Sequence, residues 1–570
     1  MAIDGRPCLK LKWKTEEPVW VDRWPLTESK VAILKQLVQE QLEQGHLVNT
    51  TSPWNTPVFV IPKKSGKWRL LHDLRKINEV MENMGALQLG LPTPTMIPQG
   101  WNILIIDLKD YFFTIYLDPK DAEKFAFSIP TINKQEPMER YHWVVLPQGM
   151  KNSPTICQSY VSQALKGFRQ QNSDLIIYHY MDDILIAGKR ELSEKLKELT
   201  TQLSDFGLKI APEKVQKMQP WKYLGWKILE KTIVPQKLEI TDKIETLNDV
   251  QKLLGTINWV RTLLGIDNEL LTPLFEMLRG DTTLTAPRQL TPQGKQALQQ
   301  IADIISQSQA FRTKENLDIN LSILNREKQP LGIIYQWEGS HKDLLIIEWI
   351  FLAHQARKTI FSRIEMISEL IIKGRRRIIE ICGQEPHTIV VPLTQGYLQW
   401  CLQNSLTLQI AFADFEGKID IHLPAHKMFT LLQNIQLEEK ELCAELPTDG
   451  PTVFTDGSGK TGKAVVVWKE GQVWKNHIVT CEGSPQVVEL QAVIEVFKKW
   501  QDVEVNIIAD SLYVVGVVKR LRRAYLKEID NITLFEKCKM LLFLLNQRTK
   551  CEYNACVKSH QFAWMDHRRE

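Results

Sequence analysis

Two adjacent aspartates, Asp182 and Asp183, stand between two apolar runs in the segment LIIYHYMDDILIAG (175–188). Apolar, β-branched runs on both sides of a polar turn are typical of a β-hairpin, here with the aspartates at its tip. Two carboxylates this close resist ionising together, and a divalent cation would remove that cost. Magnesium is usually held by one or two carboxylates together with substrate phosphates. A solvated Asp-Asp turn is the alternative that this segment alone leaves open.

A third carboxylate, Asp107, ends the apolar run ILIID (103–107) and precedes the aromatic run YFF (111–113). An acid at the end of a buried strand is costly unless a partner compensates its charge. If this strand lies beside the hairpin, three carboxylates could hold two magnesium ions. Such a pair of ions activates an attacking hydroxyl and steadies a leaving pyrophosphate. The alternative is that Asp107 caps the helix that follows it.

The composition narrows the class of protein. A chain of 570 residues is too long for one hydrophobic core and should form several domains. No apolar stretch approaches the roughly 18 residues of a membrane span, so we expect no membrane partner. The first residues, MAIDGRPCLK, lack an apolar signal core, which argues against secretion. Nine scattered cysteines without C-x-x-C pairs indicate a reducing compartment, with neither a disulfide framework nor zinc.

Several segments have clear periodicity. Residues 28–45 and 191–206 have the apolar spacing of amphipathic helices, and residues 57–75 read as a hairpin with a turn at Ser65-Gly66. The proline-punctuated segment 91–98 should not be helical. Four cations crowd the hairpin turn, and they fit either a triphosphate clamp or a solvated basic turn: Lys63, Lys64, Lys67 and Arg69.

The second half of the chain holds further candidates. Gln251, Gly255 and Trp259 recur every four residues, so they share a helix face that suits either a duplex minor groove or ordinary helix packing. Residues 314–446 suggest a mixed α/β domain, in which Arg375 to Arg377 form either a phosphate contact or a solvated face. Seventeen tryptophans suit nucleic-acid stacking, although most should lie in cores.

Four motifs together resemble those of retroviral reverse transcriptases, and they occur in that family's order. They are WRLLHDLR (68–75), IDLKDYF (106–112), LPQGMKNSP (146–154) and YMDD (180–183). The segments WKTEEPVWVDRWPL (13–26) and RYHWVVLPQGM (140–150) look closest to betaretroviruses and endogenous retroviruses of group K. Asp456, Glu489 and Asp510, on a predicted strand, helix and strand, resemble the ribonuclease H fold, which also uses two magnesium ions.

The resemblance implies an α/β (α+β) multidomain protein, a right-hand polymerase with fingers, palm and thumb, plus a connection and a ribonuclease-H-like domain. The expected boundaries are fingers 1–84 with 115–148, palm 85–114 and 149–240, thumb 241–313, connection 314–446, and a C-terminally incomplete ribonuclease-H-like domain 447–570.

The resemblance also assigns roles to individual residues. It makes Asp107, Asp182 and Asp183 the polymerase metal ligands, and Asp456, Glu489 and Asp510 the ribonuclease H ligands, with His560 as a further catalytic residue. Phe112 matches the gate under the ribose that favours deoxynucleotides. The other expected nucleotide contacts are Lys63, Arg69, Asp110, Tyr111 and Gln148. The expected nucleic-acid contacts are the primer-grip residues Tyr223, Leu224 and Gly225, the helix face Gln251, Gly255 and Trp259, and Tyr513. The basic run 519–523 fits either a hybrid contact or a solvated helix end.

The chain departs from the family pattern near its end. The family follows its histidine with a G-N-x-x-A-D segment, whereas this chain reads QFAWMDHRRE. Asp566 lies in the wrong context, so the role of fourth ligand is not transferred to it. We therefore expect weaker metal binding and a frayed last domain, which puts ribonuclease H activity in doubt.

The resulting expectation is an RNA- and DNA-directed DNA polymerase with two Mg²⁺ per active site, Mn²⁺ being the alternative ion. Its partners would be RNA or DNA template-primer and deoxynucleoside triphosphates, with a homodimer or a second Pol chain left open, and its location cytoplasmic or in the virion. The alternative is a non-catalytic nucleic-acid-binding subunit or the remnant of an endogenous retroviral Pol. An RNA-dependent RNA polymerase fits Phe112 and the last domain less well. Neither protease nor integrase motifs occur, so we expect one piece of a larger polyprotein.

Overall fold

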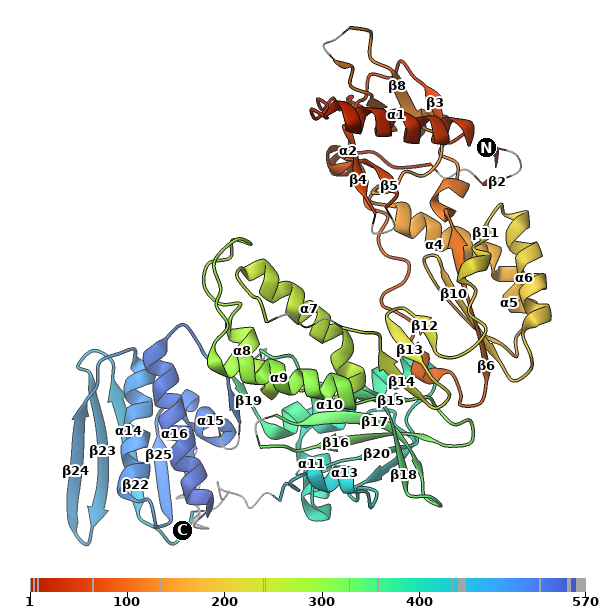
Figure 1. Cartoon of the computed structure of the whole chain (residues 1–570). Helices are drawn as coiled ribbons and strands as arrows, with labels where there is room; N and C mark the ends of the chain where they lie inside the picture. The colour runs from red at the N-terminus through yellow and green to blue at the C-terminus, as the bar shows by residue number, and fades with distance from the viewer. Residues whose placement is uncertain are drawn as a thin grey trace. The chain divides into compact units, whose positions relative to one another are not determined.

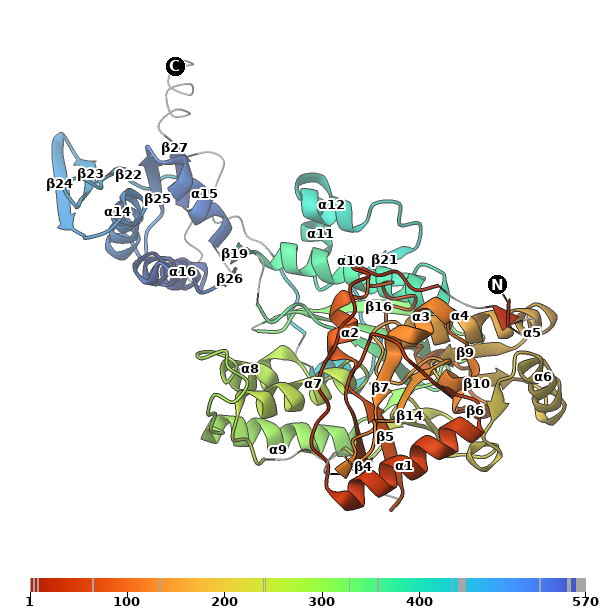
Figure 2. The same ribbon diagram turned by 90° about the horizontal axis from the view of Figure 1, so that it is seen from above.

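The chain forms two compact units, Met1–Gln236 and Lys237–Glu570 (Figures 1 and 2). The computed structural model describes residues 2–3, 6–7, 10–63, 66–132, 135–238, 240, 242–327, 329–355, 358–432, 434–438, 447–521, 524–550 and 555–559. Within these ranges no helix has both the length and the apolarity that a membrane crossing requires.

A four-stranded antiparallel sheet, in the order β11-β6-β10-β9, forms the centre of the first unit. The expected hairpin is confirmed, and the strand that carries Asp107 is the neighbour of its second strand. Ile184, Leu185 and Ile186 are fully buried, which explains why this segment is a continuous apolar run. The strands are β6 (Asn102–Lys109), β9 (Ile176–Tyr180), β10 (Asp183–Gly188) and β11 (Lys209–Ile210). Helices of this region are α4 (Ser153–Ala164), α5 (Lys166–Gln171) and α6 (Ser193–Asp205).

The first unit also contains the expected basic hairpin. Strand β4 (Val58–Pro62) pairs with β5 (Trp68–His72), although Lys64 and Ser65 of its turn lie outside the described residues. Helix α1 (Glu28–Glu43) buries Val31, Leu34 and Val38 on its apolar face, as the periodicity predicts. A three-stranded sheet consists of β3 (Leu47–Asn49), β7 (Ala126–Ser128) and β8 (Arg140–Trp143).

The expectation that residues 91–98 contain no helix is wrong in one detail. Residues Pro94–Met96 form a 3₁₀ turn, η1, because proline is compatible with the first position of a helical turn. The remaining elements of the unit are β1 (Ala2–Ile3), β2 (Arg6–Pro7), α2 (Arg75–Val80), η2 (Tyr111–Thr114), α3 (Pro119–Ala122), η3 (Glu123–Phe125), η5 (Pro212–Lys214), β12 (Trp221–Tyr223), β13 (Trp226–Ile228) and β14 (Thr232–Pro235).

Three helices gather at the start of the second unit (Figures 1 and 2). They are α7 (Leu247–Leu264), α8 (Asn268–Glu276) and α9 (Pro292–Gln307). Helix α7 begins with a capping box between Thr246 and Asp249 and ends at Gly265, whose φ of 79° is the left-handed conformation that glycine accepts readily.

Two five-stranded sheets in the second unit share one topology. Their orders are β18-β17-β16-β20-β21 and β24-β23-β22-β25-β27. In each, three antiparallel strands come first, and two parallel strands follow after a helix. The first set is β16 (Ile319–Leu324), β17 (Leu331–Glu338), β18 (Asp343–Ile350), β20 (Thr388–Val390) and β21 (Lys418–Asp420). The second is β22 (Thr452–Ser458), β23 (Lys463–Glu470), β24 (Val473–Thr480), β25 (Val505–Ala509) and β27 (Ala555–Ser559).

The helices that follow these antiparallel strands are α10 (Arg363–Cys382) and α14 (Pro485–Lys499). Figure 1 shows α14 and α16 side by side next to the second sheet. The other elements are β15 (Ala310–Phe311), β19 (Ile360–Phe361), α11 (Gln395–Asn404), α12 (Leu406–Ala411), α13 (Lys427–Leu431), α15 (Leu512–Leu521), β26 (Tyr525–Leu526) and α16 (Ile532–Lys550).

The basic run on α10 matches neither of its two sequence interpretations. Arg377 binds both carboxylate oxygens of Glu348 on β18 at 2.7 Å, and Arg375 makes a bidentate pair with Glu385. Only Arg376 of the three is exposed. Because the Glu348 side chain is only 5% exposed, Arg377 compensates a buried charge and fixes α10 to the sheet.

Replacing Arg377 by methionine should therefore leave the Glu348 carboxylate buried without a partner. We expect Arg377→Met to cost about 3–5 kcal/mol of unfolding free energy and to lower the melting temperature of the chain in calorimetry. The Arg377→Met/Glu348→Gln double variant should recover most of the loss, and Arg376→Met should be nearly neutral. Equal melting temperatures for Arg377→Met and Arg376→Met would contradict this account.

Candidate functional site

Backbone pairing brings the three carboxylates of the first unit together. Asp183 is the register partner of Asp107 in the β10–β6 ladder, and the Leu108 amide donates to the carbonyl oxygen of Asp182 at 2.9 Å. The turn between the strands places Met181 at a φ of 55°. Asp107 is thus the neighbour on the adjacent strand that the sequence predicts, and it does not cap a helix: residue 110 precedes η2 and makes no side-chain cap bond.

Gln158 on α4 holds this turn in place, and no sequence pattern indicates this contact. Its side-chain oxygen accepts a hydrogen bond from the Met181 amide at 2.8 Å, and the residue is only 8% exposed. A buried acceptor on a neighbouring helix therefore stabilises the left-handed residue that aims Asp182 and Asp183. Nothing but the fold relates positions 158 and 181, so spacing could not have predicted the contact.

The site carries more negative charge than its surroundings neutralise. Burial, followed by the Asp182 and Asp107 charges, raises the pKa of Asp183 to about 6, and burial also raises the pKa of Asp182. Both side chains are half-buried, so the pair is not a solvated turn.

Lys214, in η5, supplies the local countercharge. Its ammonium donates to both carboxylate oxygens of Asp107, at 2.8 and 3.0 Å, and these hydrogen bonds raise the pKa of Lys214. A separation of 107 positions along the chain left this contact invisible in the sequence.

The donor set suits a divalent cation. Carboxylate oxygens are the hard ligands that magnesium prefers, and burial together with the neighbouring carboxylate charges disfavours the ionised forms of Asp182 and Asp183 unless a cation is present. In the part of the chain that the structure describes, no three potential ligand side chains are grouped closely enough to complete a metal centre. Since Asp107 is bonded to Lys214, metal binding requires that this ion pair opens.

The residues expected to bind the nucleotide lie on several elements. Tyr111 is buried and Phe112 half-buried in η2, directly after β6, with ring centroids 4.3 Å apart. Gln148 is half-buried in the loop before α4. The exposed members of the expected set are Lys63, Arg69 and Asp110. Their roles in nucleotide binding stay predictions.

The expected primer grip is a tight hairpin between β12 and β13. Leu224 and Gly225 form its turn with φ angles of 44° and 80°. Tyr223 is only 1% exposed, and burial raises its pKa, with the Asp183 charge adding to the effect. The turn residues, not the Tyr223 ring, therefore form the accessible part of this hairpin.

The shared face on α7 is open. Gln251 and Gly255 are exposed, Trp259 is half-buried, and a Cβ atom added at Gly255 would meet no atom within 4 Å. The small residue thus serves no helix contact within the described chain, which leaves the face available for a duplex.

A second carboxylate group assembles at the end of the last sheet. Thr455 and Ala509 are register partners in the parallel β22–β25 pair, so Asp456, still within β22, and Asp510, the first residue after β25, lie at the same end of this pair. A Cβ atom at Gly457 would lie 2.5 Å from the Glu489 amide nitrogen, so the absence of a side chain there lets α14 approach Asp456 closely.

The structure describes only some of the other residues expected at this second site. Tyr513 on α15 is 37% exposed, and burial, followed by the Cys538 and Glu489 charges, raises its pKa. His560 and Asp566 lie outside the described residues, as do two of the cations in the run 519–523.

Family models match four consecutive parts of the chain. Residues 61–228 match "Reverse transcriptase (RNA-dependent DNA polymerase)" and residues 235–299 match "Reverse transcriptase thumb domain". Residues 327–429 match "ERVK-8-like, RNaseH-like domain", and residues 448–565 match "RNase H". The resemblance to retroviral reverse transcriptase and ribonuclease H is confirmed. The polymerase architecture with an added ribonuclease-H-like domain is confirmed with it.

Curated relatives extend the similarity over nearly the whole chain. The Gag-Pro-Pol polyproteins of simian retrovirus SRV-2 and Mason-Pfizer monkey virus are each 42% identical over 539 residues, 94% of this chain. That of mouse mammary tumor virus (strain BR6) is 40% identical over 555 residues, 97% of this chain. The chain spans about 30% of the length of these relatives. The expected sequence similarity to betaretroviral proteins is thereby confirmed.

The comparisons also explain the region 314–446, for which the sequence predicted only a mixed α/β domain. Its match to a ribonuclease-H-like family agrees with its strand order, which is the same as that of the ribonuclease H domain. Both the reverse transcriptase and the ribonuclease H families depend on divalent metal ions.

The buried negative charge at the cluster of Asp107, Asp182 and Asp183 predicts a pH-dependent cost in the stability of the fold. The folded pKa of Asp183 lies above its ordinary value of 3.8, so its ionisation destabilises the fold as the pH rises through about 6. In chelator at pH 7.5, Asp183→Asn should raise the melting temperature by on the order of 2 °C, and the gain should vanish near pH 4. The exposed Asp174→Asn variant is the control. A gain that is the same at both pH values would contradict the prediction.

Proposed function

We propose that this chain is an RNA- and DNA-directed DNA polymerase that also carries ribonuclease H chemistry. The proposal depends chiefly on the register pairing of Asp107 with Asp183 at the tip of a hairpin that also holds Asp182. Three half-buried carboxylates with raised pKa values in the aspartate pair form a site built for cations. The family matches give that site its substrate class.

In the proposed reaction the primer 3′-hydroxyl attacks the α-phosphate of a deoxynucleoside triphosphate in line and pyrophosphate leaves. Asp107, Asp182 and Asp183 would hold divalent metal, Mg²⁺ with Mn²⁺ as the alternative, which lowers the hydroxyl pKa and neutralises phosphate charge. The exposed cations Lys63 and Arg69 bind the triphosphate. Rigid support from Gln158 and β6 keeps the carboxylates in position, so little reorganisation is needed at the moment of reaction.

Lys214 is the partner of Asp107 while metal and substrate are not bound. Its ion pair with Asp107 supplies one positive charge where catalysis needs more, and Lys214 is 58% exposed. An exposed ion pair in water is worth little, about 0–1 kcal/mol. Metal and triphosphate can therefore displace the ammonium from Asp107 at a small cost.

The ribonuclease H domain would cleave the RNA strand of a hybrid as an endonuclease. Asp456, Glu489 and Asp510 would hold its metal ions, which aim water at a phosphate. Hybrid contact is assigned to Tyr513, which is partly exposed on α15.

Template-primer is the proposed macromolecular partner. We assign duplex contact to the open face of α7 and to the turn Leu224-Gly225 of the β12–β13 hairpin. A homodimer or a complex with a second Pol chain stays an expectation, as does a cytoplasmic or virion location.

Substitution of the paired aspartates tests the polymerase assignment. Asp182→Asn and Asp183→Asn should each reduce primer extension by at least about 100-fold, while hybrid cleavage by the same protein persists. Asp456→Asn should have the reverse effect, and Asp174→Asn should change neither activity. Extension at the wild-type rate by both aspartate variants would refute the proposal. Template-primer binding without extension by the wild-type chain would favour a non-catalytic binding protein.

Phe112 tests the proposed preference for deoxynucleotides. The Phe112→Val variant removes the ring that would meet a 2′-hydroxyl, so ribonucleotide incorporation should rise by about 10- to 200-fold relative to deoxynucleotide incorporation. Phe113→Val is the matched control, because the Phe113 ring stacks on His46 and Trp143 instead. Unchanged discrimination in Phe112→Val would exclude the gate.

A further inference from the structure

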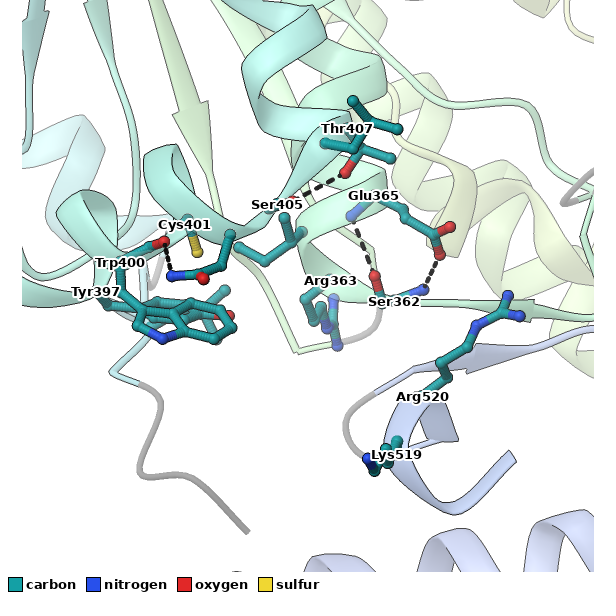
Figure 3. Close-up of a pocket in the computed structure, with 14 residues that line it drawn as sticks. Ser362, Arg363, Glu365, Tyr397, Trp400, Cys401, Ser405, Thr407, Lys519 and Arg520 are labelled. Atoms are coloured by element: carbon teal, nitrogen blue, oxygen red, sulfur yellow. Dashed lines mark hydrogen bonds between the residues drawn. The ribbon is translucent and has the colours of Figure 1, made fainter. Parts of the chain in front are cut away.

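A cavity of about 410 Å³ opens between the connection region and the ribonuclease H domain, and no part of the proposed chemistry uses it (Figure 3). Its walls come from α10, α11, α12 and α15. Main-chain hydrogen bonds connect the two regions next to the cavity. Strand β19 pairs with β26, and the Lys527 amide donates to the Thr359 carbonyl at 2.9 Å. The cavity therefore belongs to a hydrogen-bonded junction within the second unit, and its volume is within the usual range of ligand pockets.

One wall of the cavity is an aromatic platform. The rings of Tyr397 and Trp400 are stacked with centroids 5.9 Å apart and planes inclined by 19° (Figure 3). Trp400 is 44% exposed. The Asn404 side chain donates to the Trp400 carbonyl at 2.9 Å and anchors this end of α11. An exposed indole supported from behind is a surface on which a planar base can stack.

The opposite wall is cationic. Lys519 and Arg520, at the end of α15, are exposed and have no acidic partner among the described residues. Arg363, also in the lining, donates to the carbonyl oxygens of Arg326 and Glu327. The acid in the lining, Glu365, is paired with Lys358 at 2.6 Å. The exposed charges of Lys519 and Arg520 therefore favour an anionic occupant.

We propose that this cavity binds an unpaired nucleotide of an RNA or DNA strand, with its base on Trp400 and its phosphates at Lys519 and Arg520. A stacked platform with adjacent cations matches a base joined to a phosphate, whereas a protein surface would need no cations around the ring. The strand must be single, because the bases of a duplex are already stacked on one another. This inference rests on the proposed function to the extent that template-primer is the substrate.

Binding of fluorescent 12-nucleotide oligo(dT) and oligo(rU) to the full chain tests the site, with anisotropy measured across a salt series. Trp400→Ala should weaken binding of at least one oligonucleotide about 5- to 10-fold, and Trp400→Phe should restore it. Lys519→Ala/Arg520→Ala should flatten the slope of log K against log salt by about 1.4, since each phosphate contact on a single strand contributes about 0.7. The charge-conserving Lys519→Arg/Arg520→Lys variant should keep the slope. Trp474→Ala, which removes another exposed tryptophan, should leave affinity unchanged.

The same preparations separate this proposal from the polymerase assignment. Extension by one nucleotide of a primer whose template has a one-nucleotide 5′ overhang should stay at the wild-type rate in Trp400→Ala, so loss of oligonucleotide binding with intact extension supports the cavity alone. Photocrosslinking with 4-thiouridine should label the peptide that contains Trp400. Unchanged oligonucleotide affinity in both Trp400→Ala and the double alanine variant would overturn the proposal. So would a change from dimer to monomer in sedimentation with affinity unchanged, which would identify the surface as a protein interface.

Discussion

The mutual repulsion of three carboxylates is the constraint on which the first unit is organised. Asp107, Asp182 and Asp183 meet because β6 and β10 are paired in register, and burial, to which the neighbouring carboxylate charges add, raises the pKa values of Asp182 and Asp183. Lys214 offsets part of the electrostatic cost at Asp107. A fold optimised only for stability would not keep such a group half-buried. Its persistence is understandable if the charge is needed to bind metal and substrate.

The second unit contains two sheets with the same strand order, and the two sheets support different roles. In the ribonuclease H domain the parallel pair β22–β25 delivers Asp456 and Asp510 to one edge, and Gly457 admits the helix that carries Glu489. In the connection region the same strand order carries the buried ion pair between Glu348 and Arg377, which fixes a helix to the sheet. The shared fold therefore supports a carboxylate site in one copy and a structural role in the other.

The sequence predicted local features well and tertiary contacts poorly. The hairpin around Asp182 and the helical spacing of Gln251, Gly255 and Trp259 follow from sequence periodicity, and the pairing of Asp107 with the hairpin was expected from an acid at the end of a buried strand. Lys214, Gln158 and the Glu348–Arg377 pair could not be predicted, because each joins residues far apart in the chain. The burial of Tyr223 was hidden for the same reason, since burial depends on neighbours that periodicity does not identify.

A single reaction can test whether this chain is a DNA polymerase with ribonuclease H activity. Primer extension on an RNA template is measured with deoxynucleotides and, separately, with ribonucleotides, while cleavage of the RNA strand is followed in the same tube in the presence of Mg²⁺. We expect efficient extension with deoxynucleotides, little extension with ribonucleotides, and cleavage of the RNA strand of the hybrid. A chain that binds the template-primer but extends it with neither nucleotide set would contradict the account.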